Sequence, residues 1–236
     1  MSKGYVLMYG NLSSIGISNI DDLGFTVFGS FNYTFGQGYE IDEYVNTSDG
    51  INEDSLYNYY SAIYGDISYY QTIAINSCDD SDNRHEFFAQ SLININIISN
   101  ADYDDNHLSG TSLNDLIWIA SYSPIKYIQS GYNDVFDWSK MSLLSNNFKK
   151  LMLPFGFNYV NWQIKYMFPV DKLLSDVTND DLILLKSDAG SLLYNCGIFN
   201  FLFISEPTLL QTHTFTLTMT DNEGKTYSAT FTKTWE

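Results

Sequence analysis

A strict alternation of polar and apolar residues marks the last part of the chain. Residues 212–220 read THTFTLTMT, and residues 225–232 read KTYSATFT after the turn-forming stretch 221–224 (DNEG). Two alternating segments joined by a short polar turn predict an antiparallel hairpin with one buried face and one exposed face. Because successive side chains of a strand point to opposite faces, the apolar residues should be buried and the threonines should face the other way. The residues expected in the core are Phe215, Leu217 and Met219.

Short segments with strand character recur along the rest of the chain. Residues 115–120 (DLIWIA) are apolar at nearly every position, which indicates a strand buried on both faces. Polar and small residues at 11–22, and the stretch that starts at Pro169 and Asp171, indicate connections. The other segments predicted to be strands are 5–9, 23–33, 67–75, 85–89, 92–98, 151–159, 162–168, 182–185, 191–194 and 199–205.

Two segments have the spacing of helices. In residues 53–64 (EDSLYNYYSAIY) the apolar side chains predict a short amphipathic helix, although the tyrosines also suit a strand. In residues 135–148 apolar side chains recur every three or four positions, and a helix and an irregular strand fit this spacing equally well.

Many short strands with frequent turns are typical of β-sandwiches. The 19 Tyr and 16 Phe against only 4 Pro also favour strands over helices. We therefore expect an all-β fold, mostly β with one or two short helices. The length of 236 residues allows one large or two small domains, and the strands fit one β-sandwich or a pair of them. Of these we expect two tandem β-sandwich domains, at residues 1–130 and 131–236.

The charge of the chain restricts its partners. The 28 acidic residues against 11 basic ones give a formal net charge of −17. Nucleic acids and anionic membrane surfaces attract basic proteins, so neither is an expected partner. Acidity instead keeps copies of the chain soluble and mutually repelling. No apolar run approaches the length of a transmembrane helix, so we expect no membrane insertion.

One loop has part of a metal-binding pattern. Asp102, Asp104 and Asn106 have the D-x-D-x-N spacing of a calcium loop. His107 stands where such a loop has Gly, and Leu113 stands where it has Glu. A solvated acidic loop is therefore the first interpretation of these residues, and a weak calcium site is the second.

No catalytic motif is present in the sequence. No Ser or Cys lies in a nucleophile-elbow context, and His85, His107 and His213 are interpreted as surface or strand residues. No Cys/His spacing matches a zinc site; Cys78 and Cys196 allow a disulfide, although two free thiols are favoured. The tyrosines clustered between positions 57 and 70 are interpreted as covering sheet faces, with a sugar- or protein-binding surface as the alternative. We expect a protein with neither enzymatic activity nor cofactors.

Several segments resemble, in order, motifs of the fimbrillin family, whose members are subunits of bacterial pili and cell-surface adhesins. Residues 22–29 (DLGFTVFG) resemble an early strand of the family, and residues 85–89 (HEFFA) resemble a later one. Residues 114–120 (NDLIWIA) resemble the segment that closes its first domain. The last two matching segments are 154–165, which resembles the opening of the second domain, and 201–207 with the final hairpin, which resembles the ending.

The resemblance implies two transthyretin-like β-sandwiches in tandem and no enzymatic activity. It also implies partners, because family members polymerise, cap or anchor filaments by strand exchange. The first functional hypothesis is therefore a structural or adhesive subunit of an extracellular assembly, bound to copies of itself or to other subunits. Since Met1 is followed by no signal peptide, a bacteriophage virion component is the alternative. A carbohydrate-binding surface module is the second alternative.

The final hairpin is the predicted site of assembly. In the family that the chain resembles, a further strand follows this hairpin, so a second chain would complete the sheet by pairing with it. Closure by the chain's own residues 5–9 is the competing interpretation. The residues assigned to this assembly edge are Thr212, Thr214, Thr216, Thr218, Tyr227 and Trp235.

Overall fold

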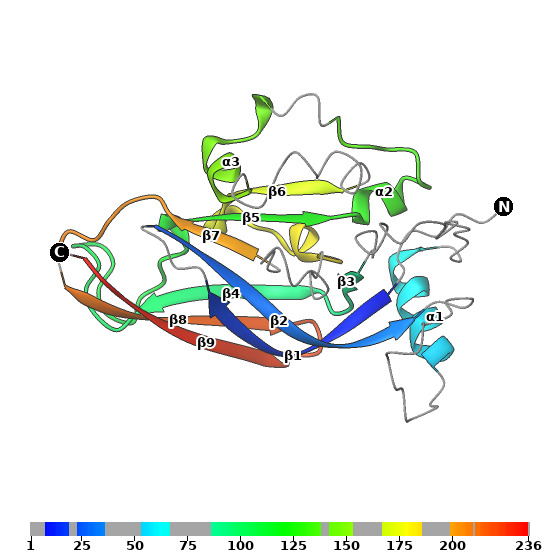
Figure 1. Ribbon diagram of the computed structural model, residues 1–236, viewed down its shortest axis with the longest axis horizontal. Coiled ribbons are helices and arrows are strands. Elements are labelled where there is room, and N and C mark those ends of the chain that lie inside the picture. Colours follow the sequence, from blue (N-terminus) through cyan, green and yellow to red (C-terminus); the bar gives the residue numbers. More distant parts are fainter. Residues whose placement is uncertain are drawn as a thin grey trace, which may run out of the picture.

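The computed structural model describes residues 8–18, 23–35, 53–66, 86–137, 142–152, 167–185, 199–209 and 211–235. They form two β-sheets, with short helices at the top and at the right-hand end of the view (Figure 1). The expected all-β class is confirmed. Among the described residues, no helix has the length and apolar character needed to cross a membrane.

The larger sheet has six strands in the order β3-β1-β2-β7-β5-β6. Its pairs are antiparallel except for β1 with β3, which run parallel. The bounds of its strands are β1 Met8–Ser18, β2 Gly24–Phe35, β3 Glu86–Phe88, β5 Ile117–Ser123, β6 Phe168–Leu173 and β7 Phe199–Phe203.

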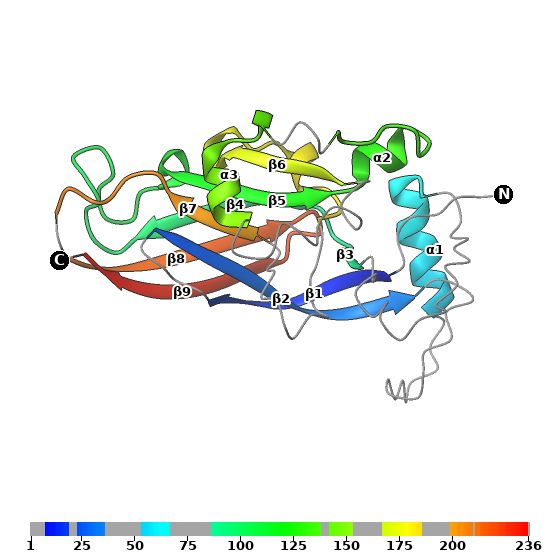
Figure 2. The ribbon, with the colours of Figure 1, turned by 45° about the horizontal axis from the view of Figure 1, so that its top comes forward.

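The smaller sheet has three antiparallel strands in the order β4-β8-β9. It consists of β4 (Leu92–Ser99) and the hairpin of β8 (Thr212–Asp221) and β9 (Thr226–Thr234). The hairpin expected at 212–232 is therefore present, and β8 also pairs with a strand that lies more than a hundred residues earlier in the chain. Figure 2 shows β8 and β9 running side by side beneath β5, β6 and β7.

A continuous apolar core fills the space between the two sheets. Alternate residues of β7, namely Phe199, Phe201 and Phe203, point into it. From the smaller sheet, β8 contributes Phe215, Leu217 and Met219, each of which is fully buried, as the alternation predicted. The threonines between them lie on the opposite face, so the predicted register of the hairpin is confirmed.

A second apolar layer lies between the larger sheet and the helices. The helices are α1 (Glu53–Tyr64), α2 (Ile125–Gln129) and α3 (Asn146–Met152), with short 3₁₀ turns at Asn114–Leu116, Leu174–Asp176 and Asn179–Leu182. Ala120 and Tyr122 of β5 face this layer, whereas Ile117 and Ile119 face the core between the sheets. The prediction that this strand is buried on both faces is thus confirmed.

Strands from both sides of residue 130 pair within each sheet. β7 lies between β2 and β5 in the larger sheet, and β8 pairs with β4 in the smaller one. The described strands therefore form one two-sheet sandwich with a shared core, and not one sandwich on each side of residue 130. The expected division into two tandem sandwiches is not confirmed, and pairing between strands that are distant in sequence leaves no local pattern from which it could be judged.

Some elements differ from the expected ones for local reasons. Residues 11–18 were expected to be a connection but belong to β1, where a bulge between Leu12 and Ser14 interrupts the two-residue period. Pro169 lies inside β6 and not in a connection; because β6 is an edge strand, it tolerates the missing N–H. Leu182, Leu184 and Leu185 are buried, but residues 182–185 contain a 3₁₀ end and bends instead of a strand.

The helix at 53–64 is confirmed as α1. At 135–148 the helix that forms, α3, overlaps only the end of the segment, and residues 151 and 152, expected to be in a strand, also belong to it. The predicted strands at 67–75 and 191–194 lie outside the described residues, as do most of those at 151–159 and 162–168.

Candidate functional site: the β8–β9 hairpin and its outer edge

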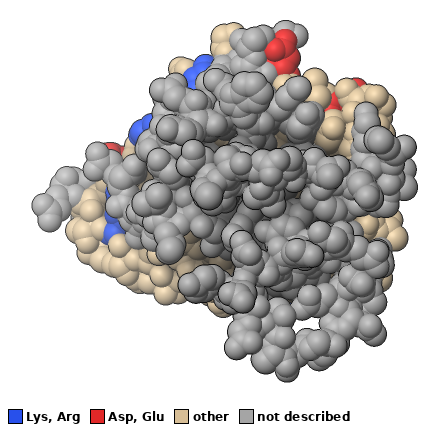
Figure 3. Space-filling view, turned by 45° about the vertical axis from the view of Figure 1, so that its right-hand side comes forward, with Lys and Arg blue, Asp and Glu red and all other residues tan. Residues whose placement is uncertain are grey.

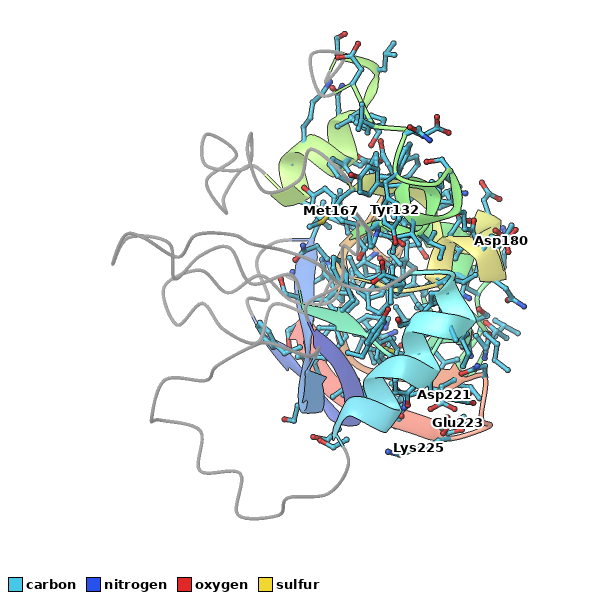
Figure 4. All side chains as sticks on the ribbon, turned by 90° about the vertical axis from the view of Figure 1, so that its right-hand side faces the viewer. Tyr132, Met167, Asp180, Asp221, Glu223 and Lys225 are labelled. Carbon is cyan, nitrogen blue, oxygen red and sulfur yellow. The ribbon has the colours of Figure 1, made fainter. Side chains whose placement is uncertain are left out.

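The turn of the hairpin is organised by the buried carboxylate of Asp221. Its Oδ1 accepts the backbone N–H groups of Glu223 at 3.0 Å and Lys225 at 2.8 Å. Its Oδ2 accepts the Tyr227 hydroxyl at 2.8 Å. Gly224 has a φ of 83°, a conformation that glycine adopts without steric cost. Figure 4 shows Asp221, Glu223 and Lys225 together at this turn, while Tyr132, Met167 and Asp180 lie in the upper part of the molecule.

The start of β9 is fastened to β1 across the sandwich. Leu12 O accepts Lys225 Nζ at 2.9 Å and lies 3.2 Å from the Tyr227 hydroxyl. Burial, and then the neighbouring Asp221 carboxylate, raise the pKa of Tyr227, so its hydroxyl remains a protonated donor at neutral pH. The hairpin is therefore held rigidly at its turn.

A ladder of hydroxyl groups covers the outer face of the hairpin. Each Thr on β8 stands opposite a Thr or Ser on β9, in the pairs 212/234, 214/232, 216/230, 218/228 and 220/226. The hydroxyls of Thr212 and Thr234 lie 2.8 Å apart, and those of Thr214 and Thr232 lie 3.3 Å apart. This face carries no charged side chain on either strand, in a chain whose formal net charge is −17.

The backbone hydrogen bonds of the hairpin show which groups of β9 point away from β8. Asp221 N donates to Lys225 O at 3.0 Å, and Trp235 N donates to Gln211 O at 3.2 Å. In an antiparallel ladder, hydrogen-bonded pairs alternate with non-bonded pairs, so the odd-numbered residues of β9 bond to β8. The even-numbered residues direct their N–H and C=O groups outward. They are Thr226, Ser228, Thr230, Thr232 and Thr234, and all of them are exposed.

The outer edge of β4, at the other side of the same sheet, is covered by the chain itself. Leu113 N donates to Ile97 O at 2.8 Å, and Gly110 N donates to Ser99 O at 2.8 Å. Asn114 supplies both hydrogen-bonding groups of its amide: Oδ1 accepts Ile97 N at 3.2 Å, and Nδ2 donates to Ile95 O at 2.8 Å. The segment 110–114 thus takes the place of a neighbouring strand.

The described edges of the larger sheet carry features that discourage further pairing. β3 has only three residues, and β6 contains Pro169 together with the charged Asp171 and Lys172. Where β1 runs beyond β3, its bulge disturbs the regular ladder. Short strands, proline, charges and bulges are the common means by which proteins protect sheet edges.

β9 differs from these edges. Its nine residues contain no Pro and no bulge in their pairing with β8. Its one charged residue, Lys233, lies next to the strand's end, with Nζ 5.0 Å from the Trp235 ring centroid. Among the described strands, β9 has a single pairing partner, β8. Its exposed outer edge is therefore the candidate site.

The residues that the sequence assigned to the assembly edge do not lie together at one open edge in the structure. Thr212, Thr214, Thr216 and Thr218 belong to β8, the central strand of its sheet. Thr216 and Thr218 pair with β4, and the backbone of Thr214 hydrogen-bonds to Asn100, so these three are not at an open edge, whereas Thr212 lies beyond the register with β4. Tyr227 and Trp235 are buried with their side chains toward the core. The pattern misplaced the edge because the partner of β8 on its other side, β4, is far away in sequence.

A buried aromatic cluster closes the end of the sandwich next to the end of β9. His213 is fully buried, and its ring lies 5.4 Å from that of Trp235 and 5.6 Å from that of Tyr103. Its Nδ1 lies 2.9 Å from Ser99 Oγ, and its Nε2 has no partner among the described atoms. Burial lowers the pKa of His213, opposed by the backbone of Leu209, so the imidazole is neutral at neutral pH.

Ser99 and His213 also bear on catalysis, since a Ser–His hydrogen bond is part of many nucleophilic sites. Here Ser99 is 2% exposed and His213 is 0% exposed, so a substrate cannot reach either side chain. Ser99 Oγ also accepts Ala101 N at 3.1 Å, which fixes the chain as it leaves β4. The geometry of this pair therefore suits a structural role.

The acidic loop after β4 uses its carboxylates internally. Asp104 Oδ1 accepts the backbone N–H groups of Asn106 and His107 at 2.8 and 2.9 Å, and Asp102 Oδ1 accepts Ser109 N at 2.7 Å. Among the described residues, no group of three or more His, Cys, Asp or Glu side chains could hold a metal ion. The calcium candidates Asp102, Asp104 and Asn106 are thus engaged in the hydrogen bonds of the loop.

His107 fastens this loop to the start of β5. Its Nδ1 lies 2.8 Å from Asp104 Oδ1, and its Nε2 lies 3.0 Å from Asp115 Oδ1. Burial lowers the pKa of His107, but the hydrogen bonds and charges of the two carboxylates outweigh it and raise the pKa above the usual value. In its protonated form the imidazolium donates to both acidic side chains.

The tyrosines of α1 cover the sheet, as expected from their clustering. Tyr60 and Tyr64 are buried, and their rings lie 5.5 and 6.0 Å from that of Tyr9. Burial raises the pKa of Tyr60 to about 12, and its hydroxyl donates to Asn11 Oδ1 at 2.5 Å. Tyr59 is exposed. The side chains of Tyr57, Tyr69 and Tyr70 lie outside those described.

A buried carboxylate behind α1 was not foreseen from the sequence. Asp66 is 2% exposed; its Oδ1 accepts the Tyr132 hydroxyl, and its Oδ2 lies 3.4 Å from the Tyr9 hydroxyl. Tyr132 has a φ of 65°, which is rare for a residue with a side chain. No short motif signals this cluster, because its three members are far apart in sequence.

Charged side chains are scattered over the described part of the face shown in Figure 3, where Lys and acidic residues appear singly among uncharged ones.

No protein-family model, curated protein or solved structure matches this chain.

Proposed function

We propose that the protein is a non-enzymatic structural subunit of an extracellular assembly, fimbrillin-like in function, and that it joins other subunits by β-strand pairing along β9. One observation carries the proposal: five exposed residues of β9 direct their backbone groups away from β8, along an edge without proline or bulge with which no other described strand pairs. Such an edge is a template for an added strand.

The contrast between the two edges of the smaller sheet supports this proposal. The chain covers the edge of β4 with residues 110–114, including the paired hydrogen bonds of Asn114. β9, in contrast, is held in place at both ends. Asp221 fixes the turn that precedes it, and Trp235 packs in the aromatic cluster at its far end. A preorganised strand loses little conformational entropy when a partner binds.

A proline scan of the outward-facing residues tests the proposal in the protein's native source. Thr230→Pro removes one outward N–H group and leaves the hydrogen bonds between β8 and β9 intact, since these belong to odd-numbered residues. Thr230→Val is the matched control, because it keeps the N–H group and the branched side chain. Complexes purified under mild conditions should contain the wild-type chain and the Val variant, and should lose the Pro variant.

Electron micrographs of the purified complexes should show a filament or a particle. Hydrogen exchange at residues 228, 230, 232 and 234 should be slow in the complex and fast in the free chain. A Thr230→Pro chain that folds, as judged by its thermal melt, and remains in the complex would contradict the proposal. So would a free monomer in the native source.

A further inference from the structure

The geometry of β9 points to a second copy of this chain as the partner: we infer that two copies pair their β9 strands antiparallel, about a two-fold axis at Thr230. This inference rests on the proposed function and names the partner of the same edge. This pairing would join the three-stranded sheets of the two copies into one continuous six-stranded sheet.

The spacing of the outward-facing residues makes the edge self-complementary. Thr226, Ser228, Thr230, Thr232 and Thr234 are symmetric about Thr230, which is the centre of the strand Thr226–Thr234. In the antiparallel pair, Thr230 meets its own copy and Thr226 meets Thr234. Every outward N–H and C=O group then finds a partner, and the same patch serves both copies, as a closed two-fold interface requires.

The side chains fit this arrangement on both faces. On the outer face, the hydroxyl ladder of the hairpin continues across the new pair, with Thr or Ser at every position. On the inner face, Lys233 of one copy comes opposite Tyr227 of the other. A Lys beside a Tyr ring already occurs within each hairpin, where Lys225 Nζ lies 4.7 Å from the Tyr227 centroid.

The neutral edge of β9 permits two copies to meet there, and the net charge of the chain predicts how their pairing responds to salt. The outward-facing residues of β9 are uncharged, although the whole chain carries −17. Two copies therefore meet through neutral strips while their remaining surfaces repel each other. Salt screens this repulsion, with a Debye length of ~3 Å at 1 M, so self-association should strengthen as salt increases. Binding of a basic partner would instead weaken with salt.

Single cysteines placed along β9 test the pairing in the purified full chain, in a Cys78→Ser/Cys196→Ser background that is first checked for wild-type thermal unfolding. Hydrogen-bonded antiparallel residues have Cα atoms about 5.5 Å apart, which a disulfide can span. Thr230→Cys should therefore form a disulfide dimer in a redox buffer. Thr226→Cys should form none with itself, because the two copies of residue 226 would lie about 27 Å apart.

The decisive sample mixes two variants. Thr226→Cys mixed with Thr234→Cys should give a disulfide heterodimer. Thr218→Cys is the control, because its side chain is on the same face but on the central strand; mixed with either variant, it should give no heterodimer. Light scattering of the wild-type chain should show a dimer whose share rises with salt. Disulfide formation by every β9 variant with itself would indicate parallel pairing and would overturn the inference.

The outcome also separates this inference from the proposed function. A chain that stays monomeric when purified, with no crosslink at residue 230, but depends on an unsubstituted Thr230 N–H group to enter its native complex, overturns the two-fold pair and leaves the proposed function intact. A chain that forms no crosslink at residue 230 and enters its native complex regardless of Thr230→Pro would overturn both the two-fold pair and the proposed function.

Discussion

The side chain of Asn114 hydrogen-bonds both ways along the outer edge of β4, accepting Ile97 N at 3.2 Å and donating to Ile95 O at 2.8 Å. One amide thus does for this edge what a neighbouring strand would do. We expect Asn114→Ala to leave both backbone groups without this partner, at a cost of about 1–3 kcal/mol in the free energy of unfolding, and to open the edge of β4 at Ile95.

Denaturant unfolding measures the first effect of Asn114→Ala, and light scattering measures the second, as concentration-dependent association. Asn94→Ala is the matched control, since Asn94 is exposed on the same strand. Equal stability and equal size for the two variants would show that Asn114 does not cover the edge.

The core position of Leu217 gives a prediction about packing. Its side chain is fully buried between Phe215 and Met219 in the core that both sheets share. Leu217→Ala should lower the free energy of unfolding by about 2–5 kcal/mol. Thr218→Ala, one residue along and on the outer face, should change it by about 0.5 kcal/mol or less. Similar losses in both variants would contradict the register of β8.

Much of this hairpin was predictable because its information is local. The alternation at 212–220 fixes which face of β8 is buried, and the polar residues at 221–224 fix the turn. The neighbours of β8 and β9 in space were not predictable. Whether Thr216 lies at an edge depends on β4, whose Ile98 pairs with it from a distant part of the sequence.

The covering of β4 by Asn114 was equally invisible from the sequence, because a single asparagine has no signature for this role. The pairing of β7 with β2 and β5, which joins the two expected domains into one sandwich, also leaves no local signal. Sequence patterns therefore defined the strands and their faces, whereas the open edge followed from contacts between distant residues.

Acid should weaken the end of the sandwich near Trp235 through His213. Its folded pKa is lowered by burial, so between that value and the usual pKa of about 6.5 only the unfolded chain binds the proton. Stability is therefore complete above pH 6.5 and falls as the pH decreases through the folded pKa. His213→Phe should remove this part of the pH dependence, measured as the denaturant midpoint over a pH series. An unchanged slope would contradict it.

His107 should act in the opposite direction. Its folded pKa is raised, because hydrogen bonds to Asp104 and Asp115 outweigh the effect of burial. Its contribution to stability is therefore complete below about pH 6.5 and is lost as the pH rises through the raised value. His107→Gln should lower stability in acid more than in alkali. The histidine NMR titration gives the pKa directly, and a value below 6.5 would exclude the imidazolium bridge.

Removing the carboxylate of Asp221 tests how the turn of the hairpin holds β9 in place. Its carboxylate, which is fully buried, accepts the N–H groups of Glu223 and Lys225 and the hydroxyl of Tyr227. Asp221→Ala should leave the two backbone N–H groups without this acceptor and the Tyr227 hydroxyl with Leu12 O alone, at a cost of about 1–3 kcal/mol in the free energy of unfolding. Asp221→Asn should lose less, because its amide oxygen can still accept the two backbone N–H groups.

Hydrogen exchange locates the effect of Asp221→Ala. The amides of Glu223 and Lys225 should exchange faster in this variant, and those of Ile97 and Leu113 at the opposite edge of the sheet should not change. If the turn is what keeps β9 preorganised, association through its outer edge should weaken in the same variant while the fold persists. A chain that loses the turn hydrogen bonds but associates with undiminished affinity would show that preorganisation of β9 has no part in binding.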